Sequence, residues 1–328
     1  TVPFGAVQLS PDTRAGNWDA CSGYHYNDTT LKGFSHTHLS GTGCIDLGDI
    51  LFRPTTLKPD LTTENIYQPA AFSHKDEDAS AGYYSVVLKE EGIKAELTVT
   101  AHAGMHRYTF PSGKEASIII DLTHLLDNEY IYEAELEQTA ANEIIGMRRT
   151  RGWTDNQYVY FVAQFSKPFQ AIDFIQNKKM VSAGVKLIGT DLQACLSFDN
   201  SNGEPVIAKV GLSIVSEKNA RENLETEVIG FDFDAVRSAA RSAWEQALSA
   251  ITVEGGNTDD LKNFYTAMYH SMVVPNVVSD VNGEYRRHNM EVGQLPKGKV
   301  QYSTFSLWDT FRAWNPLMTL IDTTLVNN

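Results

Sequence analysis

GYYSVVLKEEGIKAELTVTAH, residues 82–102, decides the fold class of this chain. Its second half places an apolar side chain at every other position with polar side chains between them, which is the pattern of a half-buried β-strand. The turn-like Glu-Glu-Gly at residues 90–92 separates this half from another apolar run, so the stretch predicts two strands joined as a hairpin. The alternating apolar positions are Ile93, Ala95, Leu97, Val99 and Ala101.

Short runs of the same kind continue up to about residue 230. Clusters of Gly, Asn, Asp and Pro separate them, as in DNSNGEP at residues 199–205. Many short strands without intervening helices predict an antiparallel sandwich of two sheets, and we assign residues 1–231 to such a domain. The runs are ASIIIDL (116–122), YIYEAELEQ (130–138), YVYFVAQF (158–165), QACLSF (193–198) and VIAKVGLSIV (206–215).

Beyond these strands, the apolar period changes to that of an α-helix. DFDAVRSAARSAWEQALSAI (232–251) carries one apolar stripe and begins with an Asp that can cap a helix. A second amphipathic run ends before Pro275, and a third lies near the C-terminus. We therefore predict a helical linker at 232–257 and the first part of a C-terminal helical domain at 258–328. Such helices cannot close a core of their own, so we expect their apolar faces to stay partly uncovered and interpret the chain as part of a larger protein.

The composition limits the classes of function. The chain has 328 residues, with 41 Asp and Glu against 27 Lys and Arg and a formal net charge of -14. That balance repels nucleic-acid backbones and anionic membrane surfaces, and no apolar run is long enough to span a bilayer. We therefore expect no nucleic-acid partner and no membrane span. A neutral, polar ligand suits the chain better than an anion.

The stretch GFSHTHLSGTGCIDLGD (33–49) is the strongest candidate for a ligand site. His36 and His38 could point the same way from a strand and bind a metal with a nearby imidazole or thiol. The GTG backbone could instead hold an anion, although no Lys follows it. The polar side chains could also satisfy one another, as buried polar groups must. The nearby imidazole and thiols are those of His25, Cys21 and Cys44.

A sugar pocket is the fourth interpretation of the same stretch. Monosaccharides present hydroxyl groups and apolar C–H faces, so their sites combine short polar side chains, backbone amides and aromatic rings. All three are close in sequence here, because GYHYNDTT (23–30) precedes the stretch and Phe34 lies within it. The residues alone leave the four interpretations open. The candidate substrate-binding residues are Trp18, His36, His38, Ser40, Gly43 and Cys44, together with the Gly41–Gly43 backbone.

Two motifs carry a family resemblance. SGYHYNDTTLKGFSHTHLSGTGCIDLGDILFRP (22–54) resembles the signature near the start of glycoside hydrolase family 92, a family of exo-acting α-mannosidases. FSLWDTFRAWNPLMTL (305–320) resembles an early helix of that family's catalytic domain. Because the order and the separation of both motifs fit, the resemblance covers essentially the whole chain. Asn315 departs from the family pattern, in which we expect His at this position.

The resemblance implies a mainly β fold with α-helices: an N-terminal β-supersandwich, similar to galactose-mutarotase-like folds, then the first helices of an incomplete (α/α)6 barrel. It implies cleavage of terminal α-linked mannose, of the α-1,2-mannosidase type, with inversion and with dependence on calcium. An inverting site needs a carboxylic acid and a carboxylate about 6.5–9.5 Å apart. In the family these groups and the calcium ligands lie in the later barrel. We therefore assign no catalytic and no metal-binding residue to this chain, and expect the chain alone to be inactive.

The segment LWDTFR (307–312) contains the remaining candidate binding residues. If it is helical, Asp309 and Arg312 share a face, and Trp308 lies about 100° from Asp309. A surface ion pair is the plain interpretation of the two charges. The resemblance implies instead that Trp308, Asp309 and Arg312 bind the sugar in the −1 subsite, where a carboxylate can accept hydrogen bonds from two hydroxyl groups.

The resemblance also implies a location and partners. We expect a secreted, periplasmic or cell-surface protein that degrades a mannose-containing oligosaccharide or N-glycan together with the remainder of the catalytic barrel. The main alternative is a stand-alone, lectin-like carbohydrate-binding sandwich without hydrolase activity, because sandwich folds host many functions. A free-standing module has no use for apolar C-terminal helices, which favours the hydrolase. A cupin-like metalloprotein is a third class, and elemental analysis would reveal it.

Overall fold

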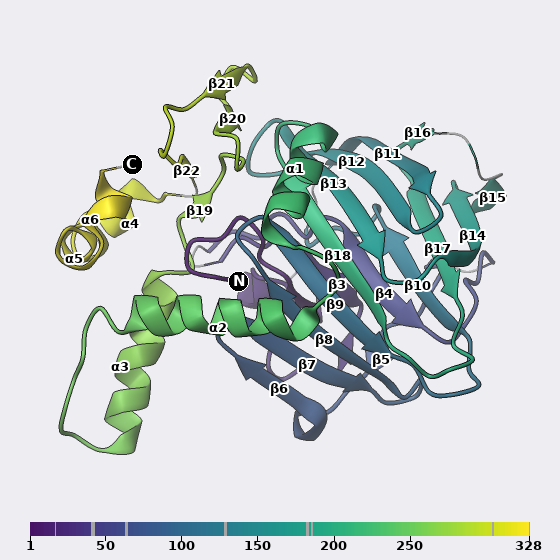
Figure 1. The fold of residues 1–328 in the computed structure, drawn as a ribbon, viewed down its shortest axis with the longest axis horizontal. Coiled ribbons are helices and arrows are strands. Elements are labelled where there is room, and N and C mark those ends of the chain that lie inside the picture. The colour runs from purple at the N-terminus through teal and green to yellow at the C-terminus, as the bar shows by residue number, and fades with distance from the viewer. Residues whose placement is uncertain are drawn as a thin grey trace.

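A computed structural model describes residues 1–16, 18–40, 43–62, 65–127, 130–181, 184, 186–303 and 305–327. Two antiparallel β-sheets form its larger part, and helices lie beside them (Figure 1). The predicted fold class, a β-sandwich followed by helices, is therefore confirmed. The sandwich ends with the strand at Val206–Ser213, and the remaining strands beyond it are short pairs.

The larger sheet has, within the described residues, nine strands in the order β16-β11-β12-β13-β18-β9-β8-β7-β6. The hairpin predicted at 82–102 forms β7 and β8, with Tyr83 opposite Thr98. Its turn needs Gly92, whose φ of 68° is one that L side chains rarely adopt. The strands are β6 (Glu77–Ser80), β7 (Tyr83–Leu88), β8 (Ile93–Val99), β9 (Ala103–Thr109), β11 (Tyr130–Ala140), β12 (Glu143–Arg151), β13 (Gln157–Phe165), β16 (Leu187–Gly189) and β18 (Val206–Ser213).

The smaller sheet has, over the same described ranges, seven strands in the order β1-β3-β4-β10-β17-β14-β15. The main core lies between the two sheets, where Phe34 and Phe52 of the smaller sheet join Tyr108 and Phe161 of the larger one in a single apolar cluster. The strands are β1 (Ser10–Asp12), β3 (Gly33–Ser35), β4 (Leu51–Thr55), β10 (Ala116–Asp121), β14 (Phe169–Gln176), β15 (Lys179–Val181) and β17 (Leu192–Phe198).

Helix α1 (Glu217–Glu227) packs on the outer face of the larger sheet, and the sequence did not predict it. Its buried apolar side chains, Ala220 and Leu224, form a stripe only one residue wide, too narrow to signal an amphipathic helix. The helix lies very close to the sheet, because a Cβ on Gly211 would sit 2.4 Å from the carbonyl oxygen of Ala220. Glycine at this position therefore permits the contact.

The predicted helices at 232–251 and before Pro275 form α2 (Phe233–Leu248) and α3 (Thr258–Ser271). Asp232 caps α2 by accepting a hydrogen bond from the backbone of Ala235, and α2 crosses the larger sheet (Figure 1). The C-terminal run is helical with breaks and forms three short helices in the described residues. These are α4 (Leu307–Thr310), α5 (Trp314–Ile321) and α6 (Thr323–Val326). The remaining elements are η1 (Trp18–Ala20), η2 (His74–Asp76), β2 (Thr30–Leu31), β5 (Ala70–Ala71), β19 (Asn276–Val277), β20 (Glu284–Arg286), β21 (Val292–Gln294) and β22 (Tyr302–Ser303).

The N-terminal segment joins the sandwich to the helices. The backbone N–H of Phe4 donates to the carbonyl of Met272 at 2.9 Å, and the indole N–H of Trp244 donates to the carbonyl of Thr1 at 2.8 Å. Phe4 also belongs to a second core with side chains of α2, α3, α5 and α6. None of the helices in the described ranges is both long and apolar enough to cross a membrane.

Candidate functional site

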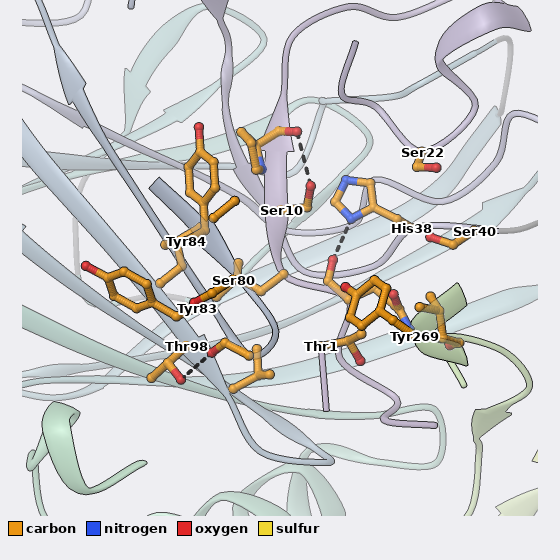
Figure 2. Close-up of a pocket in the computed structure, with 18 of the residues that line it drawn as sticks. Thr1, Ser10, Ser22, His38, Ser40, Ser80, Tyr83, Tyr84, Thr98 and Tyr269 are labelled. Atoms are coloured by element: carbon orange, nitrogen blue, oxygen red, sulfur yellow. Dashed lines mark hydrogen bonds between the residues drawn. The ribbon is translucent and has the colours of Figure 1, made fainter. Parts of the chain in front are cut away.

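A pocket of about 540 Å³ opens where the sandwich meets the helices, between the N-terminal segment, strands β7 and β8 and the end of α3. Figure 2 shows His38 and Ser40 on one side of it and Tyr83 and Thr98 on the other. Hydroxyl groups dominate the polar part of the lining, which suits a ligand that carries hydroxyl groups itself. The hydroxyl-bearing residues are Thr1, Ser10, Ser22, Ser40, Ser80, Tyr83, Tyr84, Thr98 and Tyr269.

His38 is the pocket residue whose state the structure defines best. It is almost fully buried, with Nδ1 2.5 Å from the carbonyl oxygen of Gln8 and Nε2 2.6 Å from Oδ1 of Asp12. A carbonyl and a carboxylate only accept hydrogen bonds, so both ring nitrogens carry protons and the ring is an imidazolium. Burial by itself lowers the pKa of His38, but the charge and hydrogen bond of Asp12 outweigh it and raise that pKa.

Asp12 is a fully buried carboxylate shared by two histidines. Its second oxygen, Oδ2, lies 2.9 Å from Nε2 of His124. Burial favours the neutral acid, but His38 and His124 together hold the pKa of Asp12 below its usual value. The carboxylate thereby ties strand β1 to the His38 segment and to the segment that follows β10. It fixes one wall of the pocket.

His36 does not face the pocket with His38. Strand β3 ends at Ser35 and the chain bends at His36, so the alternation expected for a continuous strand stops there. His36 is fully buried, and its Nδ1 donates to the carbonyl of Ile50 at 2.6 Å. The convergence of His36 and His38 on one strand face, which the metal interpretation requires, is therefore not found. In this arrangement His36 supports the loop from inside.

A chain of buried hydrogen bonds continues from His36 into the core. Its Nε2 lies 2.9 Å from Nε2 of His106, and Nδ1 of His106 lies 2.8 Å from the hydroxyl of Tyr108. One proton on each imidazole satisfies the whole chain, with Tyr108 as the first donor. Burial lowers the pKa of His36 to about 4, and burial together with His36 lowers the pKa of His106 as well. Both rings are therefore neutral near pH 7.

Asp49 anchors the other end of the loop. It is fully buried, and Oδ1 accepts from Nε of Arg148 at 2.8 Å. Oδ2 accepts from the hydroxyl of Thr37 at 2.6 Å and from the amide of Gln157 at 2.9 Å. The loop is thus tied to β12 and β13 of the larger sheet as well as to β1.

Gly43 of the loop lies at the surface, where Trp18 contacts it. Trp18, in η1, is 72% exposed, and its indole N–H donates to the carbonyl of Gly43 at 3.1 Å. Cys44 is half-buried and follows directly. Gly41, the first glycine of the predicted backbone site, lies outside the described residues. Of the predicted binding residues in this part of the chain, His38 and Ser40 line the pocket, whereas Trp18, Gly43 and Cys44 are not part of its lining.

The three predicted residues of the C-terminal motif lie apart from this pocket. Trp308 is 83% exposed, and the exposed Asp309 accepts a hydrogen bond from the hydroxyl of Ser306. Arg312 lies over the ring of Phe311, 5.7 Å from its centroid. In the described part of the chain no ion pair joins Asp309 and Arg312, because α4 ends at Thr310 and the i,i+3 geometry of a continuous helix is not reached.

Sequence reasoning missed Asp12 and His124, which hold His38 in place. Asp12 is 26 residues from His38, and His124 is 112 residues from Asp12, so no local pattern connects the three. The strand that contains Asp12 has the sequence Ser-Pro-Asp, which gives no local sign that the carboxylate is buried and paired.

The calcium ion that the resemblance implies needs six to eight oxygen ligands. Among the residues that the structure describes, no group of three or more His, Cys, Asp or Glu side chains is arranged to hold a metal ion. The carboxylates of the loop are instead used internally, Asp12 by histidines and Asp49 by Arg148. The residues present do not fit a calcium site, and we derive no step through calcium from them.

Fold and pocket together define a β-sandwich protein whose binding pocket is completed by a helical segment. The chain belongs to glycosyl hydrolase family 92: the model of the family's N-terminal domain matches residues 1–213, and the model of its catalytic domain matches residues 219–328. The match to the catalytic domain begins within α1.

Solved structures and curated proteins agree with this assignment. A family GH92 α-mannosidase of Bacteroides thetaiotaomicron, solved in complex with mannoimidazole, is 37% identical with a TM-score of 0.90, over 97% of this chain and 43% of that one. Another family GH92 glycosyl hydrolase is 26% identical with a TM-score of 0.87, over 100% of this chain and 45% of that one. An uncharacterised secreted glycosidase of Arthroderma benhamiae is 28% identical over 96% of this chain and 43% of its own length. The chain therefore spans less than half the length of these relatives.

Proposed function

We propose that this chain is the N-terminal portion of an exo-acting α-mannosidase that removes terminal α-linked mannose, of the α-1,2 type, with inversion. The observation that carries the proposal is the similarity over nearly the whole chain to an α-mannosidase solved with mannoimidazole. The match of residues 219–328 to a catalytic domain favours the hydrolase over a lectin-like module. The hydroxyl-lined pocket at the junction of sandwich and helices is where we place carbohydrate binding.

In this proposal the chain's own residues bind and position rather than transfer protons. The imidazolium of His38 uses both its protons on Gln8 and Asp12, and Asp12 neutralises its charge, so His38 shapes the pocket wall. Ser40 offers its hydroxyl group to the sugar, whereas the hydroxyl of Thr98, on the opposite wall, already donates to the carbonyl of Gly82 at 2.8 Å. We assign the general acid and the general base, with the spacing of about 6.5–9.5 Å that inversion needs, to parts of the parent protein outside this chain.

The further roles rest on the family resemblance. We propose that Trp308, Asp309 and Arg312 join the −1 subsite when the rest of the catalytic domain is present, and that the whole protein depends on calcium held outside this chain. We also propose a secreted, periplasmic or cell-surface protein acting on mannose-containing oligosaccharides or N-glycans. A relative that bears the name of a secreted glycosidase supports the location.

The test is turnover by the full-length protein. We expect it to release mannose from α-1,2-mannobiose, to release β-mannose first as followed by NMR, and to lose activity with a chelator until calcium is restored. The isolated chain should release no mannose under the same conditions. Kojibiose, the matching glucose disaccharide, differs at C2 and should be cleaved at least about a hundredfold more slowly. Absence of mannose release by the full-length protein would exclude the proposal, and α-mannose as the first product would exclude inversion.

A further inference from the structure

A second pocket, of about 480 Å³, lies where β10 ends and β17 begins. Its volume is within the range of roughly 300–1,000 Å³ that is usual for small-molecule sites. In the described part of the chain, its lining shares no residue with the first pocket, the one that contains His38. The ligand that suits the second pocket must therefore be inferred from its own side chains.

Three buried side chains lie between the two pockets. His38 lines the first pocket and His124 lines the second. Asp12 lies between their rings, with Oδ1 2.6 Å from Nε2 of His38 and Oδ2 2.9 Å from Nε2 of His124. Because all three side chains are almost fully buried, the pockets do not join at this point. The second pocket is a site of its own rather than an extension of the first.

Asp121 holds much of the wall of the second pocket in place. It is 4% exposed, and its Oδ2 accepts from the hydroxyl of Tyr67 at 2.9 Å. Its Oδ1 accepts from the hydroxyl of Thr123 at 2.7 Å and from the amide of Gln193 at 3.1 Å. These bonds use both carboxylate oxygens, so Asp121 fixes the other three side chains in the wall instead of meeting a ligand itself. The pocket is therefore rigid on this side.

Asp191 is the carboxylate of this pocket that has no such partners. It is half-buried, and among the residues that the structure describes none donates a hydrogen bond to its carboxylate or forms an ion pair with it. Burial and the charge of Asp121 raise the pKa of Asp191, although the charge of Lys178 opposes them. Partial burial of an unpaired carboxylate costs free energy, and hydrogen-bond donors on a ligand would recover it.

The charges around the pocket select against ions. Lys32 and Lys178 line it and repel a cation, whereas Asp121 and Asp191 repel an anion. A monosaccharide is neutral, and its hydroxyl groups can donate to a carboxylate and accept from an ammonium group. Its C–H face suits the apolar surface of Tyr67. The pocket therefore suits a sugar better than an ion of either sign.

We propose that the second pocket is a further carbohydrate-binding site, which takes one neutral monosaccharide unit and binds its hydroxyl groups through Asp191. The site only binds, and it adds no group to the cleavage step. The pocket itself selects a neutral ligand rich in hydroxyl groups, whereas the choice of mannose as that sugar rests on the proposed function.

The test is a titration of the full-length protein with D-mannose, a probe that hydrolysis does not alter. NMR of labelled methyl groups reports each pocket separately, because Ile66 and Leu125 line the second pocket and Leu97 and Val273 line the first. We expect the methyl signals of Ile66 and Leu125 to shift and to saturate, with a Kd on the order of millimolar. Inorganic phosphate and calcium chloride, added separately, should leave these two signals in place.

Asp191→Ala tests the residue that carries the inference. We expect the Kd for mannose measured at Ile66 and Leu125 to rise at least about tenfold, because a hydrogen bond to a charged group is lost. Asp191→Asn keeps the shape of the side chain and should raise this Kd less. The signal of Leu97 should respond to mannose as in the wild-type protein, which also shows that the variants fold. Asp259→Ala, which removes an exposed carboxylate on α3, is the matched control and should change neither pocket.

Three results would overturn the inference. They are Ile66 and Leu125 signals that do not move with mannose, signals that move with phosphate or calcium instead, and an unchanged Kd in Asp191→Ala. Mannose release by a full-length protein that shows no such shifts would remove this inference alone. Shifts in a protein that releases no mannose from α-mannosides would support the second site and exclude the proposed function.

Discussion

The loop at 33–49 and the C-terminal helices contain most of the predicted binding residues, but the two regions differ in how far their side chains are buried. In the loop, His38 and Asp49 are buried and paired with Asp12 of β1 and Arg148 of β12. In the helices, the side chains that the resemblance implicates are exposed, Trp308 at 83%. Apolar residues around it share this exposure, namely Phe305, Leu307, Phe311, Leu320 and Val326.

The difference indicates which part of the candidate site is complete within the chain. A buried ion pair depends on every partner, because each group that is removed leaves an uncompensated charge. An exposed side chain contributes little to stability until something covers it. Changes in the loop should therefore alter folding, and changes in the helices should alter function in the longer protein. Each experiment below tests one side of this contrast.

Asp12→Ala should have the largest effect on stability. It removes the carboxylate that neutralises His38 and accepts from His124, and breaking a buried pair costs about 3–5 kcal/mol. Urea denaturation of this chain, followed by tryptophan fluorescence, measures the loss. Asp309→Ala is the matched variant from the exposed region and should change the free energy of unfolding by less than about 0.5 kcal/mol. A loss below about 1 kcal/mol for Asp12→Ala would show that the pair is not stabilising.

Acidification should weaken the sandwich through its neutral buried histidines. Burial lowers the pKa of His36 to about 4, whereas an unfolded histidine has a pKa of about 6.5. As the pH falls between these values the unfolded chain takes up the proton first, so the free energy of unfolding should fall by about 2 kcal/mol between pH 7 and 5. The pKa of His106 is lowered too and adds to the loss.

His38 acts in the opposite direction and in a different window. Its pKa is raised in the folded state, so its contribution is complete below about pH 6.5 and is lost as the pH rises through the folded value. Stability should therefore be greatest near neutral pH and fall on both sides. His288→Gln changes an exposed ring and should leave the profile unchanged. Equal stability at pH 5 and 7 in the wild-type chain would contradict the buried neutral assignment of His36.

The sequence predicted the elements whose apolar residues recur with a clear period. It was less accurate where the structure depends on contacts between residues that are far apart in the sequence. The hairpin at 82–102 and helix α2 with its Asp232 cap follow from local pattern and are confirmed. Helix α1 was not predicted, because a stripe of two buried apolar residues gives no recognisable period. A one-residue bend at His36 was enough to separate two histidines that alternation placed together.

The site was predictable as a region but not as a set of contacts. The motif at 33–49 was singled out for its composition, and the structure places His38 and Ser40 from it in the pocket. The groups that set the charge of His38 and hold the loop, Asp12 and Arg148, come from distant strands. A sequence pattern reports neighbours along the chain, whereas these side chains are neighbours only after the two sheets have closed.

Asp309→Asn should lower kcat/KM of the full-length enzyme at least about tenfold while its stability stays near the wild-type value. Losing a hydrogen bond to a charged group costs roughly 1.5–3 kcal/mol, and the exposed carboxylate is free of an Arg312 pair in the described part of the chain. Asp259→Asn on α3 removes another exposed carboxylate and should leave kcat/KM unchanged. A correctly folded Asp309→Asn enzyme with unchanged kcat/KM would show that Asp309 is a surface residue that does not bind the substrate.

Leu320→Ala should have the smallest effect in this chain and a much larger one in the full-length protein. The side chain is 81% exposed on α5, so its truncation should change the free energy of unfolding of this chain by less than about 0.5 kcal/mol. Met318 lies on the same helix but is fully buried, and Met318→Ala should cost about 2–5 kcal/mol in either protein. If the rest of the catalytic domain covers α5, Leu320→Ala in the full-length protein should approach the cost of a buried leucine. Equal, small losses for Leu320→Ala in both proteins would mean that α5 stays exposed in the full-length protein. The exposure of the C-terminal helices would then be a property of the complete fold.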